Sequence, residues 1–167
     1  FINSNDTLTS LVIPSTISII PDNFVRNCNA LSTVFLPDSI NEMKNYAFSQ
    51  NGILTSINLP IHLNSIGSAF LRGTLINNVK IPDSITQIPQ YAFQECYGLE
   101  SVELHDAITA IGYGAFYNSG IKNIEIPSSV KTIPAVAFSS CNGLESVILQ
   151  EGVETIGERA FYHCDNL

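Results

Sequence analysis

The feature that most constrains the fold of this chain is a pattern of 22–24 residues that recurs seven times. Each copy opens with the stretch L-x-x-(V/I/L)-x-(I/L), in which apolar and polar residues alternate. The opening residues are Leu8, Leu31, Leu54, Ile76, Leu99, Ile121 and Leu144, and the column would open once more at Leu167. A period of this length predicts a solenoid, in which each copy forms one turn and packs on its neighbours.

A column of phenylalanines recurs later in every copy. Its members are Phe24, Phe48, Phe70, Phe93, Phe116, Phe138 and Phe161, and Phe1 fits the same position of a preceding copy. We expect these rings to form a continuous aromatic spine beneath the side opposite the strands. Ala precedes six of the seven, which favours a short, closely packed turn of α- or 3₁₀-helix there. A Gly or Pro column lies between the strand and the Phe and is expected to bend the chain: Pro21, Gly67, Pro89, Gly112, Pro134 and Gly157, with Lys44 as the exception.

One copy is too small to fold alone. It buries about seven apolar side chains at roughly 1.5–3 kcal/mol each, whereas ordering costs roughly 1.5 kcal/mol per residue. Stacked copies cover one another's apolar faces and pair their strands. The sequence therefore predicts one α/β solenoid over residues 1–167, a right-handed coil with a parallel β-sheet on one face. Short helical or 3₁₀ turns, or extended segments, are expected on the other face.

An inward position recurs three residues before each opening leucine. It is held by Asn5, Cys28, Asn51, Gly73, Cys96, Asn118, Cys141 and Cys164. Of the four cysteines, only Cys141 and Cys164 fall on adjacent turns, and their side chains are expected to run in parallel, which disfavours a disulfide. We expect four buried free thiols that act as small hydrophobes. No paired Cys/His spacing supports zinc.

The repeat resembles that of the BspA-like, or Treponema-type, leucine-rich-repeat proteins, L-x-x-V-x-I-P-x-S-V-x-x-I-G-x-x-A-F-x-x-C-x-x. Residues 99–116 and 121–141 follow this pattern nearly residue for residue. The resemblance implies a surface-exposed or secreted protein of bacteria or protozoan parasites that adheres to host matrix, host cells or other microbes. Single buried cysteines also leave an intracellular location open.

Composition excludes several other functions. With 7 basic and 15 acidic residues the net charge is −8, which disfavours nucleic acid and anionic lipid surfaces as partners. No apolar run reaches the roughly 18 residues of a membrane span, so we expect no membrane insertion by this segment. No nucleophile, metalloprotease or phosphate-binding motif occurs, and the three histidines lie in different copies. We therefore expect no enzyme activity, no cofactor and no resident metal.

Two columns of side chains are predicted to point outward from the strands. The first is small and polar, and is expected to form a solvated ladder of weak hydrogen bonds: Ser10, Thr33, Ser56, Asn78, Ser101, Asn123 and Ser146. The second, which ends at Ile148, provides the candidate binding residues: Val12, Phe35, Asn58, Lys80, Glu103 and Glu125. Val12 and Phe35 leave apolar area in water. Glu103 and Glu125, with His105 and Asp106 nearby, either hold a cation or a partner's basic group or are screened by Lys80 and solvent.

Two functions follow from this pattern. The first is a recognition or adhesion module that binds a protein partner, from host matrix, a cell surface or a neighbouring assembly protein, through the strand face. The alternative is a structural scaffold or spacer within a larger assembly. A carbohydrate reader is less favoured, because Trp is absent and few aromatic residues are expected outside the core. Neither end carries a polar cap, so we expect a fragment of a longer protein or ends covered by neighbouring domains.

Overall fold

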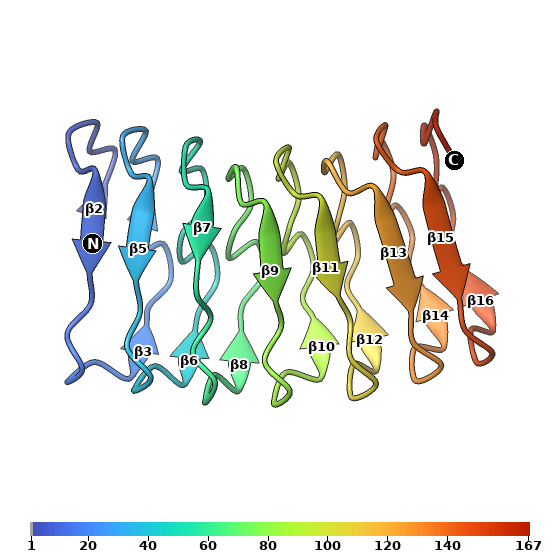
Figure 1. The fold of residues 1–167 in the computed structure, drawn as a ribbon, viewed down its shortest axis with the longest axis horizontal. Helices are drawn as coiled ribbons and strands as arrows, with labels where there is room; N and C mark the ends of the chain where they lie inside the picture. The colour runs from blue at the N-terminus through green and yellow to red at the C-terminus, as the bar shows by residue number, and fades with distance from the viewer. Residues whose placement is uncertain (1) are drawn as a thin grey trace.

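The turns of the chain stack into a rod whose two ends carry the two termini (Figure 1). The computed structural model describes residues 2–167, so the predicted place of Phe1 in a preceding copy lies outside the described residues. Seven strands, one per turn, form what we call the strand face: β2 (Ser10–Val12), β5 (Thr33–Phe35), β7 (Ser56–Ile57), β9 (Asn78–Lys80), β11 (Ser101–Glu103), β13 (Asn123–Ile126) and β15 (Ser146–Leu149). The pairs among them are parallel and in register, as Ser10 opposite Thr33 illustrates. The predicted parallel solenoid is thereby confirmed.

A second set of short strands lies farther along each turn. Its members are β3 (Ile19–Ile20), β6 (Glu42–Met43), β8 (Ser65–Ile66), β10 (Gln87–Ile88), β12 (Ala110–Ile111), β14 (Thr132–Ile133) and β16 (Thr155–Ile156). The remaining pair is β1 (Ile2–Asn3) with β4 (Val25–Arg26). Between these sets lies one continuous apolar core that runs the length of the rod.

Both sets of strands are interrupted at the same two steps. The strand face divides into β2-β5-β7, β9-β11 and β13-β15, and the second set into β3-β6-β8, β10-β12 and β14-β16. Each interruption is a step of 22 residues, as from Ile57 to Val79. In the second set proline gives the reason. Gly67 N–H donates to the Met43 carbonyl at 2.7 Å, but Pro89 and Pro134 stand at the equivalent position of the interrupted steps and have no N–H to donate.

The side opposite the strand face is built differently from the prediction. No helix occurs in residues 2–167, so the expected helical turns, and with them the α/β class, are wrong. Each turn instead carries two residues with positive φ, for example Tyr91 (57°) and Glu95 (59°). These residues direct backbone N–H groups along the rod rather than back into the same turn. Tyr91, Phe93 and Glu95 donate to the carbonyls of Tyr113, Ala115 and Tyr117, and equivalent bonds recur at every step. We call this the turn ladder.

The turn ladder also corrects the predicted Phe column. The backbone N–H of Val25 donates to the carbonyl of Ala47, and that of Leu71 donates to the carbonyl of Ala92. The backbone N–H of Phe93 donates to the carbonyl of Ala115 in the same way. Val25 and Leu71 therefore occupy the spine position, and Phe24 and Phe70 lie one residue before it. The rings follow this register. Phe24 meets Phe48 edge-on, at 87°, and Phe70 meets Phe93 at 72°, whereas the rings stack in parallel only from Phe93 to Phe161.

Positive φ at Val136 is the least favourable case in the turn ladder. Its φ is 50°, and a β-branched side chain is a steric outlier in this region. Asn23 and Gly114 fill the same column in other turns. We expect Val136→Asn to raise the free energy of unfolding by about 1 kcal/mol, because asparagine tolerates this conformation. Urea denaturation of the purified chain measures the change.

Gly114 supplies the converse control for that prediction. A Cβ on Gly114 would lie 2.8 Å from a ring carbon of Tyr91, and the residue has φ of 57°. Gly114→Val should therefore lower the free energy of unfolding by about 1 kcal/mol or more, which is at least as large as the gain expected for Val136→Asn. If the urea midpoints of both variants equal that of the native sequence, the positive φ at these two positions carries no strain.

The inward position is a ladder of polar side chains, with two corrections. Thr74 and Ser119 are buried there, in place of the predicted Gly73 and Asn118. Thr74 Oγ1 lies 3.5 Å from Cys96 Sγ, and Ser119 Oγ lies 3.4 Å from Cys141 Sγ. All four cysteines are free, and Cys28, Cys96 and Cys141 are buried as predicted, whereas Cys164 is half-buried. Their thiols donate to carbonyls of the spine position one turn back, for example Cys96 to Leu71 at 3.1 Å.

Burial of two of these thiols predicts a dependence of stability on alkaline pH. Burial raises the pKa of Cys96 and of Cys141 from 9.0 to about 11. The unfolded chain loses these protons from about pH 9 upward while the native chain retains them. The contribution to stability is thus complete below pH 9 and is lost as the pH rises towards 11. We expect the urea midpoint to fall between pH 8 and pH 10 more steeply in the native sequence than in Cys96→Ser/Cys141→Ser. Equal slopes would contradict this assignment.

Candidate binding face

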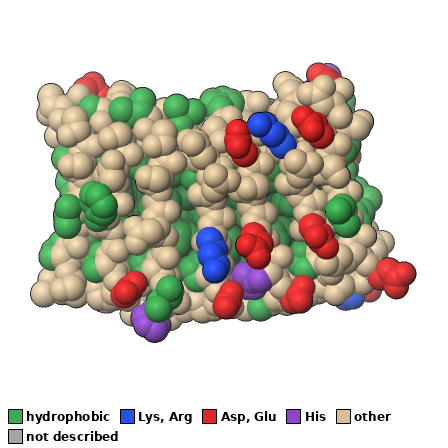
Figure 2. Space-filling model, viewed as in Figure 1, with side chains coloured by type: hydrophobic (Ala, Val, Ile, Leu, Met, Phe, Trp, Pro, Cys, Tyr) green, Lys and Arg blue, Asp and Glu red, His purple; other side chains and the backbone are tan. Residues whose placement is uncertain are grey.

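The six candidate residues all lie on the strand face with exposed side chains. Their placement follows from the alternation in each strand, which buries residues such as Val34 and Val102 and turns their neighbours outward. Figure 2 shows that backbone and uncharged polar side chains cover much of this face, and that charged side chains lie both near its upper edge and over its lower part. The outward column of small polar residues contains the hydrogen bond from Ser101 Oγ to Asn78 Oδ1, at 2.8 Å.

Val12 and Phe35 form an exposed apolar pair near the N-terminal end of the rod. They are register partners in β2 and β5, and their exposed fractions are 69% and 55%. Ile148 of β15, the register partner of Glu125, is exposed near the other end of the same face. Apolar area of this kind on a sheet surface favours contact with a partner over permanent hydration.

The charged candidates lie between these apolar ends. Lys80 and Glu103 are register partners in β9 and β11. Glu125 belongs to β13, across the second interruption, and its carboxylate accepts a hydrogen bond from Gln150 Nε2 at 2.6 Å. None of the ion pairs within 4.0 Å among residues 2–167 involves these three charged side chains. The charges are therefore available to a partner.

A first hollow, of about 310 Å³, opens at the interruption between β7 and β9, and we call it the apolar hollow. Its walls contain four apolar and three polar residues: Ile57, Leu59, Ile61, Pro82, Asn58, Lys80 and Asp83. Ile61 is 70% exposed at its rim. The structure thus brings the candidates Asn58 and Lys80 to one site.

A second hollow, of about 380 Å³, opens around the interruption between β11 and β13, and we call it the acidic hollow. It is lined by Val102, Glu103, Leu104, His105, Asp106, Glu125, Pro127 and Gln150. His105 Nε2 lies 3.1 Å from the carbonyl oxygen of Pro82, which joins the loops of the two hollows. Glu103 and Glu125 thus share one site, whereas Val12 and Phe35 line neither hollow.

Four of the fifteen residues that line these hollows were candidates, and the residues that the candidates missed include Ile61, Asp83 and Gln150. Each follows the end of a strand, in the loop on the proline side. A sequence signal for two of them exists, because Ile61 and Asp83 directly follow the prolines of their copies.

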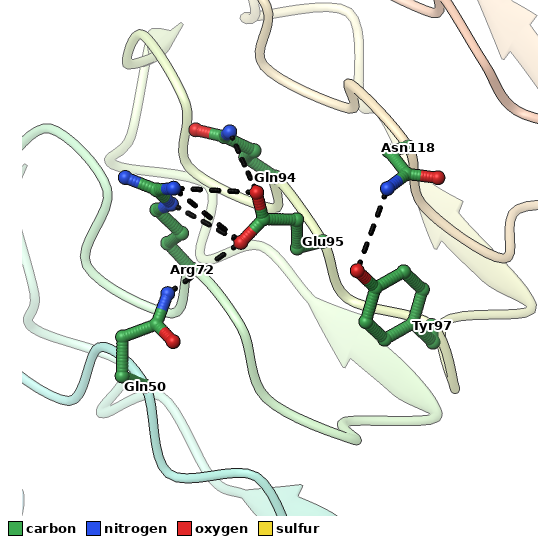
Figure 3. A network of polar contacts seen from close by, with 6 residues as sticks. All are labelled: Gln50, Arg72, Gln94, Glu95, Tyr97 and Asn118. Atoms are coloured by element: carbon green, nitrogen blue, oxygen red, sulfur yellow. Dashed lines mark hydrogen bonds and ion pairs between the residues drawn. The ribbon is translucent and has the colours of Figure 1, made fainter. Parts of the chain in front are cut away.

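The side opposite the strand face holds polar and aromatic residues that the sequence analysis did not single out. The Arg72 guanidinium pairs with Glu95 at 3.2 Å, and Gln50 and Gln94 donate to the same carboxylate (Figure 3). Nearby, Asn118 donates to the hydroxyl of Tyr97 at 3.4 Å. Among residues 2–167 the exposed aromatic side chains are Phe35, Tyr97, Tyr113 and Tyr162, four of the fifteen aromatic residues of the chain.

No group of three or more His, Cys, Asp or Glu residues within residues 2–167 is placed to hold a metal ion. The same part of the chain contains no helix long and apolar enough to cross a membrane.

The sequence profile of a family described as "BspA type Leucine rich repeat region (6 copies)" matches residues 1–74 and 64–167. These two matches together cover the whole chain. No curated protein matches it significantly.

Several solved structures share the fold. A leucine rich cell surface protein of Faecalibacterium prausnitzii is 27% identical with a TM-score of 0.63, over 97% of this chain and 53% of its own. A leucine-rich repeat protein of Eubacterium ventriosum is 19% identical with a TM-score of 0.72, over 93% and 42%. A leucine rich repeat protein of T. pallidum is 23% identical with a TM-score of 0.65, over 99% and 71%. The chain therefore spans about half the length of the first two proteins.

Proposed function

This chain belongs to the BspA-type leucine-rich-repeat family, whose members are generally non-catalytic and protein-interacting or surface-related, and from that premise we propose that it is a recognition or adhesion module. It binds a protein partner through the strand face and belongs to a surface or secreted protein. The F. prausnitzii relative, described as a cell surface protein, supports that location.

The observation that carries the proposal is the chemistry of the strand face. Phe35 and Val12 are exposed on the same surface as the two hollows, and the charged residues of these hollows form no ion pairs within residues 2–167. An aromatic anchor surrounded by polar groups is the usual anatomy of a protein interface. A spacer, one form of the alternative function, gains nothing from an exposed Phe35.

A binding assay on purified proteins tests this function. The chain is passed over a panel of immobilised extracellular-matrix and cell-surface proteins, alongside the double variant Phe35→Asp/Glu125→Lys. We expect the native sequence to bind a member of the panel and the variant to lose at least about tenfold in affinity, since an aromatic anchor commonly accounts for about 2 kcal/mol or more. Circular dichroism establishes that the variant is folded.

The matched control makes the same chemical changes on the opposite side. Tyr162 is exposed, and both Glu158 and Tyr162 lie on the turn ladder. Tyr162→Asp/Glu158→Lys should bind like the native sequence. Equal loss in both double variants, or no binding to any panel member, would favour the scaffold function.

A further inference from the structure

We infer that the two hollows form one recognition site for an extended peptide segment, in which an apolar side chain and a lysine or arginine lie three residues apart. This inference rests on the proposed function and specifies the partner. The apolar side chain enters the apolar hollow between β7 and β9, and the basic side chain enters the acidic hollow between β11 and β13.

The chemistry of the hollows assigns one side chain to each. Ile57, Leu59 and Ile61 offer the first hollow an aliphatic wall, and burying one aliphatic side chain against such a wall is favourable. The acidic hollow gathers three carboxylates, those of Glu103, Asp106 and Glu125. A lysine or arginine side chain is the group that such a lining binds with charge-assisted hydrogen bonds. The overall net charge of −8 attracts a basic segment from a distance.

Lys80 fixes which hollow takes which side chain. It lines the apolar hollow and is the register partner of Glu103, so it lies between the two sites. Its ammonium group repels a basic side chain from the apolar hollow. The same group is the reason that a peptide with two basic residues, one for each hollow, would bind poorly.

The spacing along the rod sets the spacing in the peptide. The hollows lie at interruptions that are two strands apart, and strands follow one another at about 4.8 Å, so the hollows are about 10 Å apart. A polyproline II segment rises about 3.1 Å per residue with three residues per turn, so side chains at i and i+3 lie on one side about 9.3 Å apart. Alternate residues of a β-strand are only about 7 Å apart. The site therefore selects the i, i+3 arrangement.

A labelled synthetic peptide tests the inference directly. The probe contains the sequence Leu-Pro-Pro-Arg, in which prolines hold the leucine and the arginine at i and i+3, and its binding is followed by fluorescence anisotropy at low salt. Three control peptides replace the arginine with glutamate, replace the leucine with serine, or shorten the spacing to i+2. We expect each control to bind at least about tenfold more weakly than the probe, and the affinity of the probe to fall as salt is added.

Protein variants locate the binding site. Glu103→Gln/Glu125→Gln keeps the shape of the acidic hollow and removes two charges, so the affinity for the probe should fall about tenfold. Glu158→Gln removes one exposed charge near the turn ladder and should leave the affinity for the probe unchanged. Probe binding that both variants retain, or no binding at millimolar probe, overturns the inference.

These outcomes are separate from those of the panel assay. If the strand-face variant loses affinity for a panel protein but the probe peptide does not bind the native sequence, the proposed function stands and the peptide site is rejected. A probe that binds as expected, without any panel protein bound, supports the site and rejects the adhesion partners.

Discussion

Phe116→Ala is expected to lower the free energy of unfolding by about 3–5 kcal/mol, the usual cost of removing a buried ring. The ring is fully buried and stacks in parallel between Phe93 and Phe138, at centroid distances of 5.3 and 5.0 Å. Alanine there leaves a cavity between the two flanking rings, and the hydrogen bonds of the turn ladder hold these rings apart. Because neighbouring turns stabilise one another, the loss should also broaden the unfolding transition of the rod.

Urea denaturation followed by circular dichroism measures this loss. Phe35→Ala is the matched control, because the ring of Phe35 is 55% exposed on the strand face. We expect the control to stay within about 0.5 kcal/mol of the native sequence. A Phe116→Ala variant as stable as the control would show that the parallel stack does not hold the C-terminal turns together.

Asn51→Ala is expected to cost about 3 kcal/mol. The Asn51 side chain is fully buried, accepts the N–H of Cys28 at 2.9 Å and donates to the carbonyls of Val25 and Phe48 at 3.0 and 2.7 Å. Alanine removes all three bonds and leaves buried backbone groups without partners, at about 1–3 kcal/mol for a group left unsatisfied.

The corresponding asparagine at the end of the rod provides the control. Within residues 2–167, the Asn5 side chain accepts hydrogen bonds from Thr7 and Leu8 of its own turn and makes none to another turn. Asn5→Ala should therefore cost about 1 kcal/mol or less, and both variants are compared by the same denaturation series. A loss in Asn51→Ala no larger than in Asn5→Ala would mean that solvent replaces the buried bonds.

The sequence predicts those parts of the fold that depend on the alternation of apolar residues. The alternation around Val34 or Val102 requires one buried side chain between two outward ones, so the strand face and its candidate residues followed from pattern alone. The predicted helical turn failed because Ala-Phe is equally compatible with a helix and with the turn ladder. What distinguishes them is the positive φ of residues such as Tyr91 and Glu95, which carry no common sequence signal.

The shorter copies account for the errors at the inward position. Counting back from Ile76 and Ile121 gives Gly73 and Asn118 at the inward position, but each of these copies lacks one residue between that position and the opening residue. The true column is three residues after the spine position, which places Thr74 after Leu71. The hollows were beyond the reach of the sequence for a related reason. They depend on how the chain absorbs a missing residue, which side-chain pattern does not specify.

The unequal continuity of the ladders determines how the rod responds to force. At the step from the third to the fourth turn, Ala69, Leu71 and Gly73 all donate across the turn ladder, while the strand ladders on the other two sides are broken. The same holds at the step from the fifth to the sixth turn. Fewer backbone hydrogen bonds therefore join neighbouring turns at these two steps than elsewhere along the rod, although Asn77 and Lys122 still donate to Thr55 and Glu100 on the strand side. A bend of the rod that opens the strand face should occur most readily at these steps, and it would change the shape of the two hollows there.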